Sequence, residues 1–347
     1  MNRLVLIAFL SLVCSAEGAD SDRSAAGADT GRPAGSDRAA VADVEIREWQ
    51  VPWAESRPRD PFVAADGRVW FVGQRSHYVA VLDSRSGEFR RYDLPAGTGP
   101  HNLVVDGEGA VWYAGNLVSL IGRLDPESGA VETFPMPDPA VRDPHTLVFA
   151  ADGTIWFTAQ IGNRVGHFDP RSGEIRLIQV PTASARPYGI VPDGRGRVWV
   201  AEVGTNKIGV VDAATMAYRE IVLPRSEARP RRVVVTPDGV VWYVDYAGGR
   251  LGRIDPESEA IEEWDAPAGA RSRPYAMAAD SAGRVWFVET GPQPNRFVGF
   301  DPGTESFFEP VAIPSGGGSV RHMHFDRATN AIWFGTDANT IGRALLP

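Results

Sequence analysis

Histidine, tyrosine and arginine recur eleven residues before each of seven regularly spaced tryptophans. The tryptophans are Trp70, Trp112, Trp156, Trp199, Trp242, Trp286 and Trp333. The residues eleven positions earlier are Arg59, His101, His145, Tyr188, Arg231, Tyr275 and His322. A constant spacing predicts that these side chains form one ring, in which imidazole can accept a proton and guanidinium can bind an anionic oxygen. The pattern favours a binding or catalytic site, and a polar rim around a solvated channel is the alternative.

A second set of equivalent residues stands two positions earlier and is rich in arginine. Its members are Arg57, Gly99, Asp143, Arg186, Arg229, Arg273 and Val320. These arginines predict a basic mouth in a chain whose formal net charge is −9. Such a mouth would concentrate a small-molecule or anionic ligand, unless the arginines pair with acidic loops nearby. The predicted ligand-binding residues are Arg59, His101, Tyr188, Arg231, Tyr275, Arg186, Arg229 and Arg273.

Carboxylates are predicted to lie beside two of the histidines. Neighbouring strands that run antiparallel place the end of the second beside the start of the first, so His322 should face Asp337. His322 is therefore the first candidate for a catalytic base, and His145, next to Asp143 and His101, is the second. A histidine beside a carboxylate can act as a general base or belong to a hard-metal site, which makes Asp337 and Asp143 the predicted metal ligands.

The elements that position these residues follow from the tryptophan intervals, which are 42, 44, 43, 43, 44 and 47 residues. A period of 40 to 50 residues with short alternating runs, such as Ala110-Val111-Trp112-Tyr113, is typical of a β-propeller with one four-stranded blade per repeat. The sequence therefore predicts an all-β, seven-bladed propeller over residues 43–347. Identical tryptophans in every repeat indicate packing between blades.

The two ends of this domain predict how the ring closes. Residues 340–345 match a third strand, and residues 44–52 match an outermost strand, so the N-terminal strand should complete blade seven and leave no open edge. Asp-Pro turns join the outer strands, as in Asp125-Pro126-Glu127-Ser128-Gly129. Blades five and six have Glu259 and Glu305 in place of the glycine, and looser turns are expected there.

The first 42 residues differ in composition. Residues 1–16 have a basic start and a short apolar run, which predicts an export signal too short to span a bilayer. Residues 17–42 read as a disordered linker. Cys14, the only cysteine, either lies in a cleaved signal or carries a lipid anchor. We expect a periplasmic or secreted monomer, and the acidic charge argues against a nucleic-acid partner.

The repeats resemble the streptogramin lyase family, also called virginiamycin B lyase, through segments such as Ala185-Arg186-Pro187-Tyr188-Gly189 and Asn206-Lys207-Ile208-Gly209. The resemblance covers residues 43–347. It implies a seven-bladed propeller that opens the ester of a cyclic depsipeptide by magnesium-dependent elimination. In register, it places His322 at the family's base and Asp337 at a metal ligand. Val320 stands where the family has the first metal ligand, and Tyr275 replaces the blade-six histidine.

Three functions remain open from the sequence. The first is an exported lyase of the streptogramin lyase type with Mg²⁺ as cofactor, acting on an ester or lactone. The second is a non-catalytic periplasmic propeller that binds a ligand or a protein. The third is a calcium-dependent lactone hydrolase, for which Glu202, Asp245 and Glu289 would be the carboxylate cluster.

Overall fold

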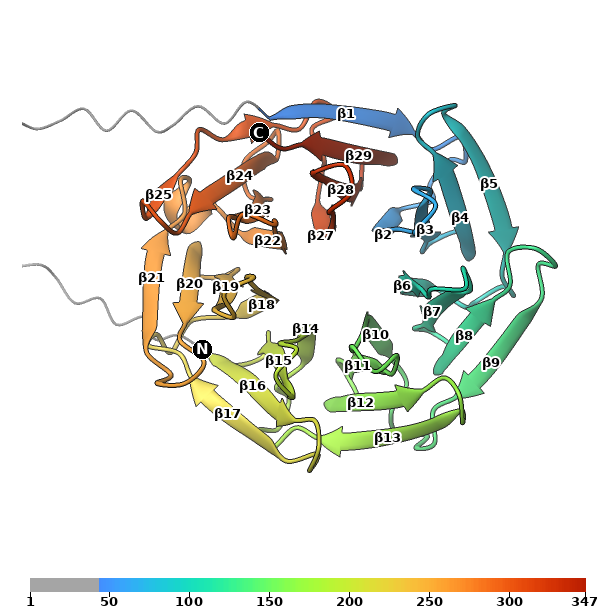
Figure 1. Ribbon diagram of the computed structural model, residues 1–347, viewed down its shortest axis with the longest axis horizontal. Coiled ribbons are helices and arrows are strands. Elements are labelled where there is room, and N and C mark those ends of the chain that lie inside the picture. Colours follow the sequence, from blue (N-terminus) through green and yellow to red (C-terminus); the bar gives the residue numbers. More distant parts are fainter. Residues whose placement is uncertain (1–43) are drawn as a thin grey trace, which may run out of the picture. The chain divides into compact units, whose positions relative to one another are not determined.

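Short alternating runs form the strands of seven antiparallel sheets, which stand as blades around a central axis (Figure 1). The computed structural model describes residues 44–347. The predicted all-β, seven-bladed propeller is confirmed. The predicted export signal, linker and possible lipid anchor at Cys14 lie outside the described residues. No helix within residues 44–347 is long and apolar enough to cross a membrane.

Blades one to four each contain four strands in chain order from the axis outward (Figure 1). Blade one contains β2 (Pro58–Val63), β3 (Val69–Gly73), β4 (Tyr78–Asp83) and β5 (Glu88–Asp93). Blade two contains β6 (Pro100–Val105), β7 (Val111–Gly115), β8 (Leu120–Leu124) and β9 (Val131–Pro135). Blade three contains β10 (Pro144–Phe149), β11 (Ile155–Ala159), β12 (Arg164–Asp169) and β13 (Glu174–Gln179). Blade four contains β14 (Pro187–Pro192), β15 (Arg197–Glu202), β16 (Lys207–Asp212) and β17 (Tyr218–Val222).

Blades five to seven keep the plan with two departures. Blade five contains β18 (Pro230–Val235), β19 (Val241–Asp245), β20 (Arg250–Ile254) and β21 (Ile261–Asp265), and the 3₁₀ turn η1 (Gly269–Arg271) follows it. In blade six the outermost strand is split in two. Its strands are β22 (Pro274–Ala279), β23 (Val285–Glu289), β24 (Arg296–Asp301), β25 (Ser306–Phe307) and β26 (Val311–Ala312). Blade seven contains β27 (Val320–Asp326), β28 (Ala331–Thr336), β29 (Thr340–Leu345) and, as its outermost strand, β1 (Glu45–Gln50).

The closure of the ring follows the prediction. Strand β1 pairs antiparallel with β29 from Glu45 opposite Leu345 to Gln50 opposite Thr340. The ring of Trp49 also stacks on Trp333, with centroids 5.4 Å apart. The strand therefore supplies both backbone hydrogen bonds and apolar packing to the edge of blade seven.

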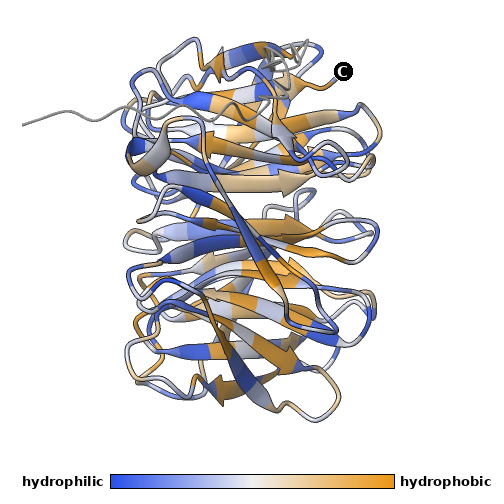
Figure 2. Cartoon of the chain, turned by 90° about the vertical axis from the view of Figure 1, so that its left-hand side faces the viewer, coloured by the Kyte–Doolittle hydropathy of each residue, from blue (hydrophilic) through white to orange (hydrophobic). Residues whose placement is uncertain are grey.

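The seven repeat tryptophans pack between neighbouring blades, as predicted. Trp70 contacts Leu103 and Tyr113 of the next blade in one buried cluster, and the same relation continues round the ring. It ends with Trp333 packed against Phe71 of blade one. In side view the strands carry most of the hydrophobic colour and the loops at both faces most of the hydrophilic colour (Figure 2). The tryptophan packing between blades therefore fixes the positions of the innermost strands, which carry the residues at the axis.

The expected loosening of the blade-five turn is wrong. In the blade-two turn Gly129 has φ of 73° and its N–H donates to Asp125 O at 2.8 Å. Glu259 replaces this glycine in blade five, with φ of 59°, and makes the same bond to Asp255 O at 2.9 Å. The turn forms in both cases because the hairpin requires it, and the non-glycine residue accepts an unfavourable backbone conformation.

Candidate functional site

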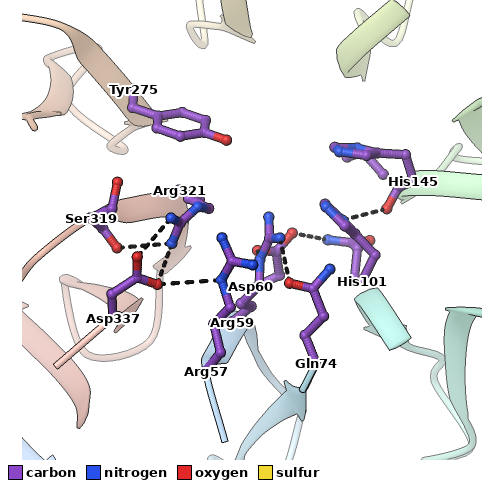
Figure 3. A network of polar contacts seen from close by, with 12 residues as sticks. Arg57, Arg59, Asp60, Gln74, His101, His145, Tyr275, Ser319, Arg321 and Asp337 are labelled. Atoms are coloured by element: carbon purple, nitrogen blue, oxygen red, sulfur yellow. Dashed lines mark hydrogen bonds and ion pairs between the residues drawn. The ribbon is translucent and has the colours of Figure 1, made fainter. Parts of the chain in front are cut away.

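The start of each innermost strand places one side chain at the mouth of the central channel. A proline opens the strand in six of the blades, and the pairing with the second strand shifts directly after it, between Pro144 and Leu147 in blade three. Such a bulge turns the intervening side chains away from the regular alternation. Figure 3 shows several of these side chains directed towards the axis. We call the seven residues the mouth ring: Arg59, His101, His145, Tyr188, Arg231, Tyr275 and Arg321.

The seventh member of this ring is Arg321, and the prediction of His322 at that place is wrong. In blade three Pro144 pairs with Ala159, three residues after the tryptophan. In blade seven the residue at that register is Val320, opposite Thr336. The hairpin between β27 and β28 contains one more residue than its counterparts, so counting back eleven residues from the tryptophan falls one residue short of the ring position. His322 consequently lies one layer deeper along the channel.

Asp337 is bound by arginine, which corrects the predicted His322–Asp337 pair. Both carboxylate oxygens of Asp337 accept hydrogen bonds from Arg321, at 2.7 Å for Nη2 to Oδ2. The Nε of Arg57 lies 3.5 Å from Asp337 Oδ1 (Figure 3). Arg59 makes the equivalent contact in blade one, where its Nη1 donates to Gln74 Oε1 at 3.0 Å. In both blades the residue four positions after the tryptophan binds the ring arginine of its own blade: Asp337 neutralises the charge of Arg321, and Gln74 orients Arg59.

His101 and His145 lie together, as predicted, but Asp143 does not orient them. Their ring centroids are 3.6 Å apart, and His101 Nδ1 lies 3.2 Å from the carbonyl oxygen of His145. The two carboxylate oxygens of Asp143 instead accept the backbone N–H groups of Ile161 and Gly162, at 2.6 and 2.9 Å. Asp143 thus fixes a loop, and the histidine pair is held by the contact of its tilted rings and by the hydrogen bond from His101 Nδ1 to the His145 carbonyl oxygen.

Arg231 lies among three tyrosine rings. Its guanidinium carbon is 5.1 Å from the ring centroid of Tyr188, 4.3 Å from Tyr246 and 4.1 Å from Tyr275. The hydroxyl groups of Tyr188 and Tyr275 are hydrogen-bonded to each other. Burial opposes ionisation of Tyr188, but the guanidinium groups of Arg59, Arg232 and Arg231 lower its pKa below the ordinary value. These cations make the hydroxyl of Tyr188 more acidic, and therefore a better hydrogen-bond donor, than an ordinary phenol.

Sequence reasoning missed the layer beneath the mouth ring. We call it the inner tier: Asp60, Asn102, Thr146, Gly189, Arg232, Ala276 and His322. Arg232 crosses the channel from blade five, and its Nη2 lies 3.8 Å from Asp60 Oδ2 in blade one. Asp60 also accepts a hydrogen bond from Asn102 at 3.0 Å. The detectable signal was two opposite charges, Asp60 and Arg232, directly after ring residues in a segment that is otherwise small or neutral.

Burial and neighbouring charges together set the protonation states of Asp60 and the three histidines at the axis. Although burial opposes ionisation, Arg59, His322 and Arg232 lower the pKa of Asp60 to about 2, so its carboxylate remains charged. Burial, followed by the charge of Arg232, lowers the pKa of His322 to about 3. Burial and the nearby guanidinium groups also lower the pKa values of His101 and His145 well below the ordinary value. All three imidazoles are therefore neutral near pH 7.

The rim above the mouth ring has two chemically different sides. Arg186 and Arg273 are exposed, Arg229 is half-buried, and none of them makes an ion pair with a residue within 44–347. Over the histidine side, Leu117 and Ile161 are 67% and 81% exposed. Because Leu117 N donates to Thr98 O, next to the start of β6, its loop lies at the mouth. Cationic and apolar surfaces thus face each other across the channel.

The predicted metal ligands do not fit a divalent cation. The carboxylates of Asp337 and Asp143 are occupied as described, and Mg²⁺ is usually held by one or two carboxylates. Within residues 44–347 no group of three His, Cys, Asp or Glu side chains is arranged to hold a metal ion.

The hypothesis of a calcium-dependent lactone hydrolase loses its carboxylate cluster as well. Glu202 is buried in blade four, Asp245 accepts the N–H of Arg229 at 2.8 Å, and Glu289 is paired with Arg296.

Three solved structures that share this fold are lyases. The chain is 24% identical to virginiamycin B lyase from Staphylococcus aureus, with a TM-score of 0.79 over 88% of this chain and 100% of that one. A catalytically inactive variant of the same enzyme with quinupristin gives 24% identity and a TM-score of 0.80, with the same two shares covered. A streptogramin B lyase structure gives 25% identity and a TM-score of 0.78, covering 88% and 98%.

Sequence comparison agrees with these structures. No curated protein gives a match to the chain. The model of the virginiamycin B lyase family matches residues 35–293, which is more than half of the chain. The repeats, the seven blades and this match together place the chain in the virginiamycin B lyase family.

Proposed function

We propose that the protein opens an ester or lactone by elimination at the mouth ring, without a resident metal ion. The observation that carries the proposal is the position of two neutral imidazoles, His101 and His145, beside the buried guanidinium of Arg59. The Nη2 of Arg59 is buried and has no hydrogen-bond partner within residues 44–347. A base next to an unsatisfied cation suits a reaction in which a proton leaves and negative charge develops.

The reaction would use these groups as follows. His145 accepts the Cα proton next to the substrate carbonyl, and the electron pair left on carbon forms a C=C bond. The Cβ–O bond of the ester breaks at the same time, and the departing group leaves as a carboxylate. Arg59 stabilises the negative charge on the carbonyl oxygen during this change. The proton on His145 then passes to the released carboxylate or to solvent, which regenerates the base, so the atoms balance without water and the product is an isomer of the substrate.

The two sides of the rim support a substrate that is both apolar and carbonyl-rich. Leu117 and Ile161 would contact its apolar side chains, and burial of that surface favours binding. Arg186 and Arg273 would bind its carbonyl oxygens or the carboxylate that is released. A cyclic depsipeptide such as quinupristin, which occupies a related lyase, has these properties.

The test uses quinupristin with the full chain in the presence of EDTA. Elimination gives a ring-opened product of unchanged mass, whereas hydrolysis adds the mass of one water. Because a positioned base contributes ~10²–10⁴-fold, His145→Ala should lower turnover by that factor. His167→Ala is the matched control, since His167 lies on β12 against Trp156, away from the mouth. Loss of activity in EDTA that Mg²⁺ restores would contradict the proposal.

A second candidate function is binding of an anionic ligand without turnover. The low pKa values of His101 and His145 favour it, because burial makes both imidazoles weak bases. In that case quinupristin would remain intact, and Arg186→Ala together with Arg273→Ala would weaken binding of a dicarboxylate measured by calorimetry. Full binding by this double variant would remove the second candidate.

We also propose export, on the basis of the basic and apolar start of residues 1–16. Mass spectrometry of the mature N-terminus tests it. A chain that retains Met1 would contradict export, and an acylated Cys14 would identify a lipoprotein.

A further inference from the structure

A cavity of about 270 Å³ lies on the axis, on the far side of the inner tier from the mouth. Asn102, Thr146, Arg232 and His322 line its inner end. Its walls come from the later residues of the innermost strands, such as Val191 and Phe325. The inner tier separates this cavity from the mouth ring, so the channel contains two distinct compartments.

Two buried polar atoms at the inner end of the cavity have no hydrogen-bond partner within residues 44–347. Arg232 is 4% exposed, and its Nε and Nη1 donate to Arg321 O at 3.0 Å and to Thr146 Oγ1 at 3.3 Å. Its Nη2, however, has no hydrogen bond within the part of the chain described. The same holds for Nδ1 of His322. Buried polar atoms are nearly always satisfied, so each of these needs an explanation.

The charge at the inner tier is also unbalanced. Arg59 and Arg232 are both buried, and Asp60 is the carboxylate that they share, at 3.4 and 3.8 Å. Two guanidinium groups against one carboxylate leave one positive charge in a buried region. Removing a charge from water without a counter-ion is costly, so an anion at this point would stabilise the folded protein.

The outer end of the cavity is apolar and reaches water. Val191, Val234 and Phe325 line it, and all are half-buried rather than buried. His324 lies there as well, with its ring 4.4 Å from that of Phe62. A ligand entering from this face would meet apolar walls first and the two unsatisfied nitrogens last.

We propose that this axial cavity binds a small carboxylate with an apolar body, such as a medium-chain fatty acid. The carboxylate lies at the inner end, where it accepts hydrogen bonds from Nη2 of Arg232 and from Nδ1–H of His322. The alkyl chain lies along Val191 and Phe325. The site goes beyond the proposed lyase function, because it opens on the opposite face and uses the other side of the inner tier.

Calorimetry with the full chain and octanoate tests the proposal. We expect one site per chain for octanoate, and about 10- to 100-fold weaker binding of octanol, because octanol lacks the charge that Arg232 would bind. Acetate should bind more weakly than octanoate, since it leaves the walls uncovered. Equal affinity for octanol and octanoate, or no saturable binding of octanoate, would overturn the proposal.

Two valine variants locate the site without touching a charged group. Val191→Phe fills the outer end of the cavity and should lower octanoate affinity at least about tenfold through steric exclusion. Val222→Phe is the matched control: Val222 lies on the outermost strand of the same blade and is 62% exposed. Unchanged affinity in Val191→Phe, or equal loss in both variants, would place octanoate elsewhere and contradict the assignment.

Discussion

The tryptophan layer and the axial layer of this propeller are built on opposite rules. Between the blades, Trp70 and its six counterparts repeat the same side chain and are at most 3% exposed. At the axis the mouth ring mixes arginine, histidine and tyrosine at equivalent positions, and the inner tier has a different side chain in each blade. The first layer stabilises the ring through uniform apolar contact. The second carries charge and hydrogen-bonding groups that uniform packing does not require, so chemistry is expected where the repeat is broken.

The largest effect should come from opening the tryptophan layer at blade seven. A chain that begins at residue 53 lacks β1 and the Trp49–Trp333 stack, and exposes the edge of β29. A chain that begins at residue 43 retains them. Thermal unfolding should show a large loss of stability, of several kcal/mol, for the shorter chain. Equal melting temperatures for the two chains would mean that β1 is dispensable.

A charge substitution at the axis should cost more when the charge is buried. Asp60→Asn leaves Arg59 and Arg232 without a buried counter-ion and should destabilise the protein by about 3–5 kcal/mol. Asp337→Asn removes the partner of Arg321 at the rim, where the carboxylate is 32% exposed, and should cost about 1 kcal/mol or less. Denaturant unfolding measures both, and the reverse order would contradict the distinction between the inner tier and the rim.

Glu202 should make stability depend on pH. Burial and the charge of Glu220 raise its pKa from 4.5 to about 7. The folded state therefore binds the proton more tightly, and this contribution is present below pH 4.5 and is lost as pH rises through about 7. Glu202→Gln should remove this pH-dependent loss of stability, which is about 3 kcal/mol for a shift from 4.5 to about 7. Melting curves from pH 4 to pH 8 test it, and an identical slope in both proteins would refute the assignment.

The smallest effect concerns the strained turns of the outer hairpins. Glu305 has φ of 52° at the position that Gly129 occupies in blade two. Glu305→Gly should relieve the strain but also gives the unfolded chain more freedom, so a net stabilisation of about 0.5–1 kcal/mol is expected. The equivalent Gly129→Ala should destabilise by a similar amount. If both substitutions stabilised the protein, the positive φ of the turn would not be the cause of the change in stability.

The sequence predicted the fold almost completely because the tryptophan period reports a structural unit. It predicted six of the seven mouth-ring residues for the same reason. His322 failed because the hairpin after β27 has one extra residue, which shifts the inner strand relative to Trp333. The interval of 47 residues before Trp333, longer than the others, was the available signal.

Side-chain partners were less predictable than positions. Asp337 and Asp143 were placed at the mouth correctly, but their hydrogen bonds go to Arg321 and to backbone N–H groups. Such choices depend on distances of a few ångströms between blades, which the spacing of residues along the chain does not encode. Asp60 and Arg232 belong to blades that are far apart in sequence, so the two charges can be noticed in the sequence but no local pattern indicates that they pair.

The closure of blade seven by β1 has a consequence for how the chain folds. Gln50 Nε2 donates to Asn339 O across a sequence separation of 289 residues. At a synthesis rate of about 5–20 residues per second, β1 waits roughly 15–60 s on the ribosome for its partner. During that time the apolar face of β1 and the unfinished edge of the arc remain exposed to other chains. Closure of the ring therefore cannot precede the synthesis of β29, and we expect the protein to be most prone to aggregate in the interval before closure.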